Sequence, residues 1–448
     1  MKPSSTCRRP PEASPRPKHG AFFVWLAAAG LILRFFWVVS RHSVNLFFFD
    51  EWDVYDGLFR GWPWWRFFLQ EHGPHRQGLG VTVVVWLLRA THWDSRVQAY
   101  AIASAIIVAM LSAIHLKARL YGGLGWSDII IPVLFLGLGQ WEVLLSAPGP
   151  SAQAFPLLLL ISYCVAWSHQ KPWLRYSGIV ILNFLLVYTG YGIFVSIITL
   201  LLLAVACWQN RKERGAMIAP LAAFIASTLS LASFFYKYAF NPAADCFRFP
   251  YPNLAAYPWF IGLMFGRFLG IKRGTILPGA IGVLVLILLM AVCVRSLLMV
   301  LEGLNRANVG VLILTGYTLV YAAAAAIGRV CMGMQAAGSS RNITLLIPGF
   351  VGLYFCLLNR NQSRHTRIAI FVLLLAVLPA CIQRNHKEIE GFSAMKAAWK
   401  RCYLANEKVA YCDAQSHLQL YPKPTATHLN EKLAYLKENR LNLYGDPH

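Results

Sequence analysis

The chain has 448 residues, of which 57% are hydrophobic and only 13% are charged. Soluble domains carry roughly a quarter charged residues, so this composition excludes a soluble globular protein and indicates a polytopic, all-α membrane protein. The net charge of +22 comes from Lys and Arg in short clusters between hydrophobic segments. That pattern is typical of cytoplasmic loops and not of a nucleic-acid-binding surface, so no nucleic-acid partner is expected.

The chain begins with a basic tail followed by an apolar run. Residues 1–20 include Lys2, Arg8, Arg9 and several prolines, which predicts a disordered tail in the cytoplasm. No small-residue cleavage site follows the apolar run over 21–40. A signal peptide would carry such a site, so this run is predicted to remain as the first membrane span.

About eleven apolar segments are predicted to cross the membrane, because they approach the length of a bilayer core and have Lys or Arg nearby. With the N-terminus in the cytoplasm, every connection then assigned to the cytoplasm contains Lys or Arg. The transmembrane domain is therefore predicted over residues 21–382. Its spans are predicted at 21–40, 97–116, 127–146, 151–168, 177–189, 191–208, 216–236, 275–298, 308–327, 342–358 and 367–382.

Two apolar segments, 76–93 and 255–270, are short and interrupted by Arg or Gly. They are predicted to be juxtamembrane helices at the outer face, with Trp and Tyr at the level of the headgroups. A third irregularity, from Thr189 to Gly192, breaks a long apolar stretch into two spans. Such breaks are tolerated in membranes where they line a cavity.

The C-terminal segment, residues 383–448, is polar and is predicted to be extracytoplasmic. Residues 391–412 predict a helix leading into a short strand or loop, and residues 427–441 predict a terminal helix. Cys402 and Cys412 lie in this segment, where disulfides persist, and both a bridge and two free thiols fit the sequence. The chain has no CxxC pair, so no zinc site is expected.

The most unusual stretch is "FFFDEWDVYD", in the predicted first outer loop over residues 41–96. It places Asp50, Glu51, Asp53 and Asp56 within seven residues, beside a run of aromatic residues. A solvated acidic loop would have the same charge. Carboxylates against apolar surface at a membrane are more often functional, so this loop is the candidate catalytic loop.

This loop resembles the first outer loop of the GT-C superfamily of membrane glycosyltransferases, which includes protein O-mannosyltransferases and lipid A aminoarabinose transferases. In those proteins an acidic motif follows the first span, and an "HPP" element precedes a hydrophobic helix. Here "EHGPHR" occupies that place, with His72, Pro74, His75 and Arg76. The resemblance covers about the first 120 residues well.

A later segment is similar to one in uncharacterised bacterial membrane proteins of the same type, which reads "GR…G…A…SRY". This chain reads "GRVCMGMQAAGSSRN", with Arg329 and Arg341 in the matching places and Asn342 where Tyr is usual. Between the two matching regions the likeness is one of topology alone.

The resemblance implies a polyprenyl-phosphate-linked sugar donor and a glycan, lipid or protein acceptor in the cell envelope. The reaction would take place at the extracytoplasmic face of a bacterial inner membrane, among membrane lipids. It needs a base for the proton of the acceptor and cations for the departing phosphate. Asp50 is the predicted base and Glu51 the alternative, while Arg329 and Arg341 are predicted to bind the phosphate. Further predicted substrate-binding residues are Asp53, His72, His75 and Arg76, and Asp56 is a weaker candidate.

No metal is assigned, because the spacing matches no metal motif, although loop acids with His72 or His75 leave a divalent cation compatible with the sequence. Glu142 and Gln153 lie near the outer ends of their spans, and a structural role fits Glu142 as well as a functional one. Two other functions compete with a transferase. A flippase for lipid-linked sugars would carry polar residues at mid-membrane positions, and a non-catalytic assembly subunit would not need the acids.

Overall fold

The structure is a computed structural model that describes residues 18–145, 150–242, 246–271, 274–359, 363–382, 386–425 and 427–445. Nearly all of the predicted N-terminal tail lies outside these residues, as does the predicted domain boundary at residue 383. The described chain is almost entirely helical. Its strands are the two-residue β1 (Glu71–His72) and β2 (His75–Arg76), which pair in one antiparallel hairpin.

The helices follow the predicted segments closely. Those of the first half are α1 (Lys18–His42), α2 (Glu51–Val54), α3 (Asp56–Phe59), α4 (Trp64–Leu69), α5 (Gly78–Ala90), α6 (Arg96–Tyr121), η1 (Trp126–Ile129), α7 (Ile130–Phe135), η2 (Leu138–Gln140), α8 (Trp141–Leu145), η3 (Pro150–Ala154), α9 (Phe155–Trp167), α10 (Pro172–Tyr188), η4 (Gly190–Phe194) and α11 (Val195–Gln209). Those of the second half are α12 (Arg214–Phe234), α13 (Ala256–Phe268), α14 (Ile276–Glu302), α15 (Arg306–Arg329), η5 (Val330–Met332), η6 (Met334–Gly338), η7 (Ser340–Asn342), α16 (Ile347–Leu358), α17 (Arg364–Ile382), α18 (His386–Asn406), α19 (Val409–Ser416), α20 (Leu429–Glu438) and η8 (Asn442–Tyr444).

Within the described ranges, seven helical stretches are long and apolar enough to cross a membrane. They are Gly20–His42, Arg96–Tyr121, Trp126–Leu145, Gly190–Gln209, Arg214–Phe234, Ile276–Glu302 and Arg306–Met332. The prediction of an all-α membrane protein is confirmed to this extent. The other predicted spans are α9, α10, α16 and α17, of which the first three have 13, 17 and 12 residues. At about 1.5 Å per residue these three fall short of a core about 30 Å thick, so the total of about eleven spans stays a prediction.

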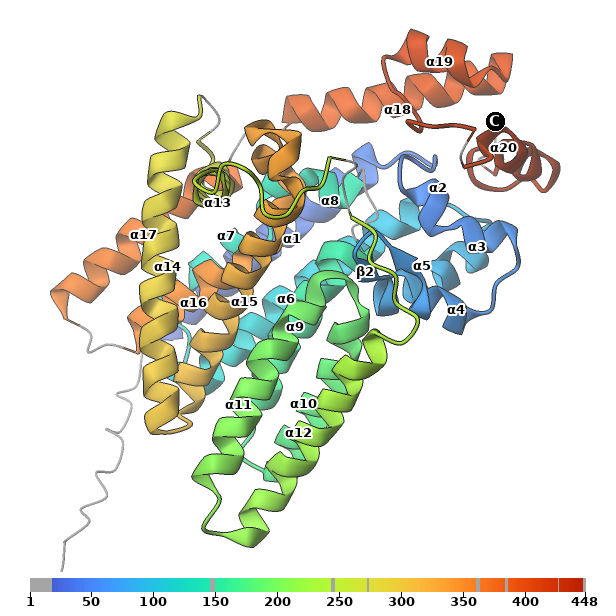
Figure 1. The fold of residues 1–448 in the computed structure, drawn as a ribbon. Coiled ribbons are helices and arrows are strands. Elements are labelled where there is room, and N and C mark those ends of the chain that lie inside the picture. The colour runs from blue at the N-terminus through green and yellow to red at the C-terminus, as the bar shows by residue number, and fades with distance from the viewer. Residues whose placement is uncertain are drawn as a thin grey trace, which may run out of the picture.

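The helices pack as one bundle (Figure 1). α6 packs against α1 and α9, α10 against α9 and α12, and α15 against α14 and α16. Large apolar side chains stay exposed on the outside of α1, α12, α14 and α17, for example Leu33, Leu229, Leu284 and Phe371. Contiguous apolar surface of this kind is unusual on a soluble protein and suits a lipid environment.

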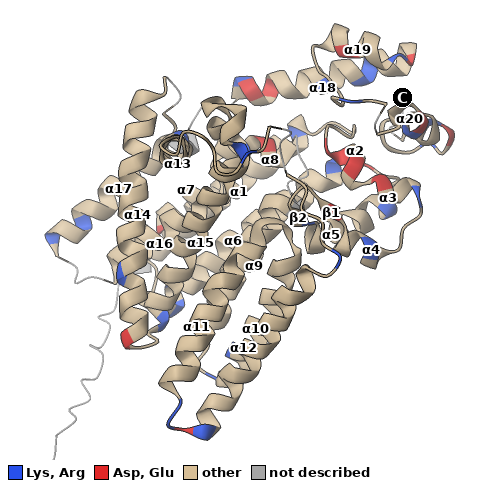
Figure 2. Ribbon diagram, in the orientation of Figure 1, with Lys and Arg blue, Asp and Glu red and all other residues tan. Residues whose placement is uncertain are grey.

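Charge divides the two ends of the bundle (Figure 2). The carboxylates of α2 and α3 lie at the end that also carries α18, α19 and α20. Lys and Arg mark short connections at the opposite end, such as the one between α11 and α12. This is the distribution that the positive-inside rule describes for cytoplasmic loops.

The predicted juxtamembrane segment over 255–270 is helix α13, which is seen nearly end-on in Figure 1 and therefore crosses α14. Small residues permit the close crossing. A Cβ on Gly262 would lie 2.7 Å from the carbonyl oxygen of Gly279, and one on Gly282 would collide with the backbone of Gly262. Small residues at helix contacts are the usual way for membrane helices to approach closely.

The predicted break after α10 is present, and the start of α5 packs against it. α10 ends at Tyr188, η4 follows, and the Thr189 hydroxyl accepts a hydrogen bond from the Leu79 amide (3.1 Å). Gly78 makes this approach possible, because its φ is +54° and a Cβ there would collide with the carbonyl oxygen of Tyr188. Only glycine meets both conditions without strain.

We expect Gly78→Ala to lower the free energy of unfolding by more than about 2 kcal/mol, because it adds steric overlap to an unfavourable φ. Gly61→Ala is the matched control, since Gly61 has a φ of +63° with open space around its Cβ position. That change should cost only about 1 kcal/mol, the penalty of the left-handed conformation. Detergent-solubilised variants can be compared by thermal unfolding, and equal losses would contradict the close approach at Gly78.

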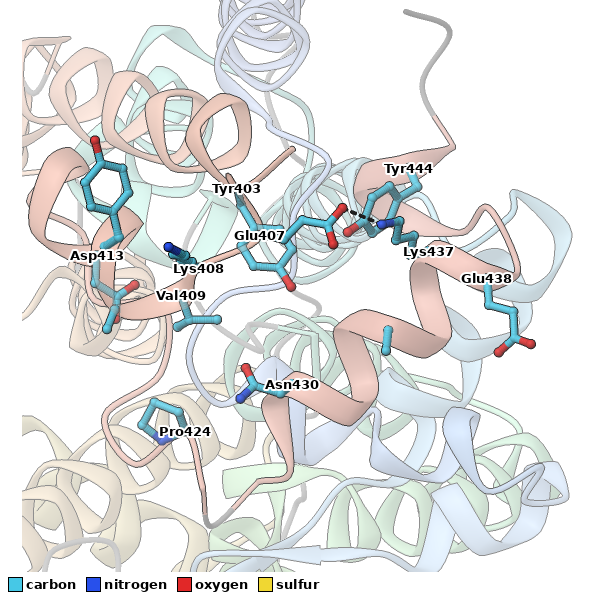
Figure 3. Close-up of a pocket in the computed structure, with 13 residues that line it drawn as sticks. Tyr403, Glu407, Lys408, Val409, Asp413, Pro424, Asn430, Lys437, Glu438 and Tyr444 are labelled. Atoms are coloured by element: carbon cyan, nitrogen blue, oxygen red, sulfur yellow. Dashed lines mark hydrogen bonds and ion pairs between the residues drawn. The ribbon is translucent and has the colours of Figure 1, made fainter. Parts of the chain in front are cut away.

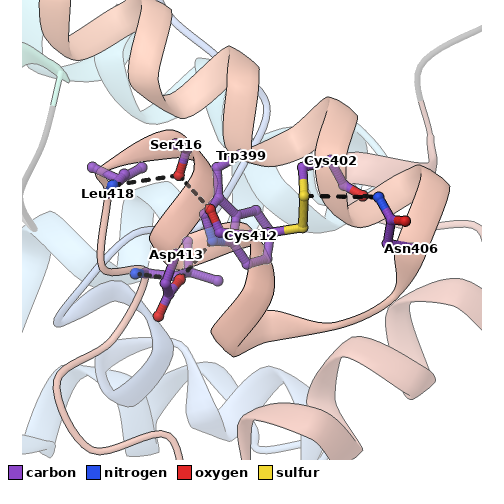
Figure 4. The surroundings of a disulfide bond; sticks show 8 residues. Trp399, Cys402, Asn406, Cys412, Asp413, Ser416 and Leu418 are labelled. Carbon is purple, nitrogen blue, oxygen red and sulfur yellow. Dashed lines mark hydrogen bonds between the residues drawn. A yellow bond between two sulfur atoms is a disulfide. The ribbon is translucent and has the colours of Figure 1, made fainter.

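The C-terminal segment, residues 386–445, folds onto the first outer loop. The predicted helices are present as α18 and α20, but residues 409–416 form helix α19 where a strand or loop was predicted. Cys402 of α18 and Cys412 of α19 form a disulfide that joins the two helices, with Cα atoms 5.6 Å apart. Figure 4 shows the Trp399 indole beside this bridge, donating to the Asp413 carboxylate (2.6 Å).

Candidate functional site

Asp50 stands at the start of helix α2, where its backbone is held from both sides. Phe49 has a φ of +54°, and its amide donates to the Leu420 carbonyl of the C-terminal segment (2.9 Å). The Asp50 carbonyl accepts the amides of Asp53 and Val54. Because successive residues at a helix start point to different sides, Asp50 and Glu51 separate, and Asp53 returns to the side of Asp50.

The β1–β2 hairpin carries the predicted residues His72, His75 and Arg76 and places them on different faces. Its register pairs His72 with His75 and Glu71 with Arg76 around a turn at Gly73, which has a φ of +59°. Directly paired residues of an antiparallel hairpin share a face, and neighbours along a strand point to opposite faces. The two histidines therefore share one face, and Arg76 belongs to the other.

The two predicted arginines come from the far end of α15 and the turns after it. Arg329 donates to the Asn342 side-chain oxygen (3.1 Å) and to the Tyr191 hydroxyl (3.4 Å). Asn342 thus positions Arg329. Arg341 lies 3.8 Å from the Glu142 carboxylate, which also accepts the Arg341 amide (3.2 Å). Glu142 is therefore a structural partner of the turn that carries Arg341.

These segments enclose a cavity with a volume of about 830 Å³. Six of the eight predicted site residues line it: Asp50, Asp53, His72, His75, Arg329 and Arg341. Gln77, Gln153 and Tyr191 also line it, so the break after α10 does border a cavity as predicted. Residues from five separate parts of the chain thus meet in one polar space at the end of the helix bundle, namely 49–77, 152–153, 191, 239–242 and 329–341.

The charges in the cavity keep Asp50 ionised. Burial alone would raise the pKa of its carboxyl. His72, 3.8 Å from the Asp50 carboxylate, together with the charges of Arg341 and Arg329, outweighs burial and holds the pKa of Asp50 below its ordinary value. His75 behaves oppositely, because burial, aided by the nearby charges of His72 and Arg329, lowers its pKa to about 3. At neutral pH the site therefore holds an aspartate and a neutral imidazole.

Glu51, the alternative base, does not line the cavity. Its side chain is 2% exposed, and it accepts hydrogen bonds from the Phe48 amide (2.7 Å) and from Gln98. Burial raises the pKa of Glu51 against the opposing charge of Lys396, itself buried on α18. Through Gln98 of α6 and Lys396 of α18, Glu51 anchors the loop to these two helices.

The other two loop acids hold the C-terminal segment. Asp53 borders the cavity, but its carboxylate accepts the hydroxyls of Tyr421 and Thr427. Asp56 lies outside the cavity, at the start of the separate helix α3. Its carboxylate pairs with Lys432 of α20 (2.8 Å). Of the four loop acids, Asp50 alone lines the cavity without serving as an anchor.

Arg76 also lies outside the cavity, on the opposite face of the hairpin from the histidines. It pairs with Glu71 (3.1 Å) and donates to the backbone carbonyls of Leu69, Phe234 and Tyr236. These bonds tie the hairpin to the end of α12. The substrate-binding role predicted for Arg76 has no geometric basis in this arrangement.

A second disulfide was not predicted from the sequence. Cys246 and Cys331 are 85 residues apart, and their Cα atoms lie 5.8 Å from each other. The bridge ties the loop after α12 to η5, where Cys331 directly precedes Met332, a residue that lines the cavity. The only local signal was that Cys246 lies in a polar outer loop, and that signal does not identify the partner.

Another cavity, with a volume of about 1080 Å³, lies within the C-terminal segment (Figure 3). Tyr403, Glu407, Lys437 and Tyr444 line it, and the Glu407 and Lys437 charges pair with each other. No residue of the predicted site lines it. Among the described residues, no group of three or more His, Cys, Asp or Glu side chains is arranged to hold a metal ion.

Comparison with known proteins found no matching family model, no matching curated protein and no matching solved structure. The fold and the cavity therefore define a class, a helical membrane protein with a charged cavity at one end of its bundle. A more specific function is inferred from the chemistry of that cavity.

Proposed function

We propose that the protein is a membrane glycosyltransferase. It moves a sugar from a polyprenyl-phosphate-linked donor to a glycan, lipid or protein acceptor, at the extracytoplasmic face of a bacterial inner membrane. One observation carries the proposal. The same cavity contains the ionised Asp50 and the two cations Arg329 and Arg341.

The chemistry follows from these groups. An acceptor hydroxyl or amine attacks the anomeric carbon of the donor, and the bond from that carbon to the phosphate oxygen breaks. The lipid phosphate leaves as an anion, which Arg329 and Arg341 stabilise. The proton of the acceptor passes to Asp50, which acts as general base.

Two features support the extracytoplasmic side. In the Cys246–Cys331 bridge, Cys331 directly precedes Met332, which lines the cavity, and the Cys402–Cys412 bridge lies in the segment that contacts the loop acids. Disulfides persist in oxidising compartments outside the cytoplasm. The basic connections lie at the other end of the bundle (Figure 2).

The proposal is tested with purified protein in liposomes that contain polyprenyl-phosphate sugars and candidate acceptors. A transferase releases free polyprenyl phosphate in step with sugar transfer to the acceptor. A flippase instead moves the intact lipid between leaflets, and an assembly subunit does neither. Lipid movement without release of polyprenyl phosphate would refute the transferase.

The acid limb of the pH profile should depend on His72. The base must be deprotonated, so turnover falls as the pH drops through the pKa of Asp50, which His72 helps to keep low. We expect His72→Gln to raise that pKa and to move the acid limb of kcat/KM to higher pH. His115→Gln, at an exposed position near the far end of α6, should leave the limb in place. An unchanged limb in His72→Gln would contradict this role.

A further inference from the structure

Three nearly buried side chains of the cavity carry polar atoms without a hydrogen-bond partner in the described chain. They belong to His75, Gln77 and Gln153, which are 7%, 1% and 5% exposed. The atoms are His75 Nδ1 and the side-chain oxygens of the two glutamines. Buried polar atoms in folded proteins nearly always have partners. Three residues that each carry such an atom line a single cavity, which points to a ligand or ordered water there as the missing partner.

His75, Gln77 and Gln153 differ from other residues with unpartnered buried atoms because they line the cavity. Asn183, Ser196 and Ser227 also lack partners for side-chain atoms, but they lie in α10, α11 and α12 and do not line the cavity. The three that line the cavity come from two separate parts of the chain. The backbone N–H of Gln77 donates to the backbone carbonyl of Gln70 (2.8 Å). Gln153 belongs to η3.

The chemistry of these atoms selects the ligand. A carboxamide oxygen only accepts hydrogen bonds, so two of the three atoms require a ligand that carries donors. An ionised phosphate has only acceptors, and a hydrocarbon chain has neither. Hydroxyl groups supply donors, and they also suit the neutral imidazole of His75, which donates or accepts according to its tautomer.

We propose that His75, Gln77 and Gln153 form the subsite for the hydroxyl-bearing sugar ring of the donor, separate from the arginines that bind its phosphate. This assignment rests on the proposed function and deepens it, because it divides the cavity into an anion-binding part and a hydroxyl-binding part. The matching ligand is a glycosyl phosphate. A site built to bind hydroxyls discriminates strongly against analogues that lack them.

The test compares two kinds of soluble probe, farnesyl phosphate and a panel of farnesyl-phosphate hexoses and pentoses, binding to the protein in nanodiscs. Wild-type protein should bind at least one sugar-bearing probe more tightly than the bare phosphate. Gln153→Met and Gln77→Met should each weaken that probe about tenfold, the value of one well-placed hydrogen bond. Both variants should leave farnesyl phosphate unchanged, whereas Arg341→Gln should weaken both kinds of probe.

Thermal unfolding of the ligand-free protein provides a second readout. Replacing a buried amide whose oxygen has no partner by an apolar group of similar size removes the desolvation penalty of that oxygen, so Gln153→Met should melt at the same temperature as wild type or higher. A merely structural glutamine would give a lower melting temperature. Gln419→Met, at an exposed position, is the control and should change neither binding nor melting.

The outcomes distinguish the two proposals. If the glutamine variants weaken both kinds of probe equally, or neither, the sugar subsite is overturned while the phosphate site stands. Equal wild-type affinity for bare and sugar-bearing probes also overturns it, and would mean that water alone fills these positions. If wild-type protein binds no probe, the proposed function fails together with the subsite.

Discussion

Asp50→Asn should reduce sugar transfer by about 10²- to 10⁴-fold, the usual contribution of a general base. The Asn side chain keeps the size of Asp but cannot accept a proton. Because the Asp50 side chain is 32% exposed and anchors no other segment, the variant should fold and accumulate normally. Transfer is measured as release of polyprenyl phosphate by protein in liposomes, with the donor at saturation.

Two variants complete this test. Asp94→Asn changes another carboxylate of the same loop, whose partner is Arg96 (2.8 Å), and should leave turnover close to wild type. Glu51→Gln changes the buried neighbour of Asp50 and should reduce the yield of folded protein more than the turnover of the folded fraction. If Glu51→Gln abolishes turnover and Asp50→Asn does not, the assignment of the base is wrong.

Lys117→Met should lower the free energy of unfolding by about 3–5 kcal/mol, the cost of removing one partner from a buried ion pair. Lys117 Nζ lies 2.7 Å from the Asp128 carboxylate, and the two side chains are 1% and 0% exposed. Asp128 also accepts the Gly125 amide and the Tyr354 hydroxyl. Met has about the length of Lys, so the main change is an uncompensated buried carboxylate. Unfolding in mixed detergent, followed by circular dichroism, measures the loss.

The matched control is Lys437→Met, which breaks an ion pair whose members are about half exposed. It should cost no more than about 1 kcal/mol, because water screens such pairs. Adding Asp128→Asn to Lys117→Met should restore part of the stability by removing the unpaired charge. A similar cost for Lys117→Met and Lys437→Met would contradict the stabilising role of the buried pair.

The helices were largely predictable because their signals are local. An apolar run with basic flanks is visible in about twenty residues of sequence, and α6, α12, α14 and α15 follow such runs closely. Helix α19 was missed; it packs against α18, to which a disulfide joins it. The third predicted span is divided into η1, α7, η2 and α8, an irregularity that hydropathy does not register.

The candidate site was predictable only in part. Acids beside aromatics and arginines at helix ends are visible in sequence, and most of these residues do line one cavity. Gln77 was not predicted as a site residue, and Gln153 was noted only for its position near the end of a predicted span. Their importance lies in a missing hydrogen-bond partner, which depends on every neighbour in space and on no local pattern.

The sequence by itself determined that the protein is a helical membrane protein with an acidic loop after its first apolar helix and two arginines in the segment that follows a later one. Only the tertiary structure decided what each carboxylate does. Glu51, Asp53 and Asp56 hold the C-terminal segment or the loop, and Asp50 faces the cavity with Arg329 and Arg341. The physical reason is that composition and periodicity act over a few residues. A carboxylate's contacts depend on distant partners, such as Gln98, 47 residues from Glu51, and Thr427, 374 residues from Asp53, and these meet it only when the chain folds.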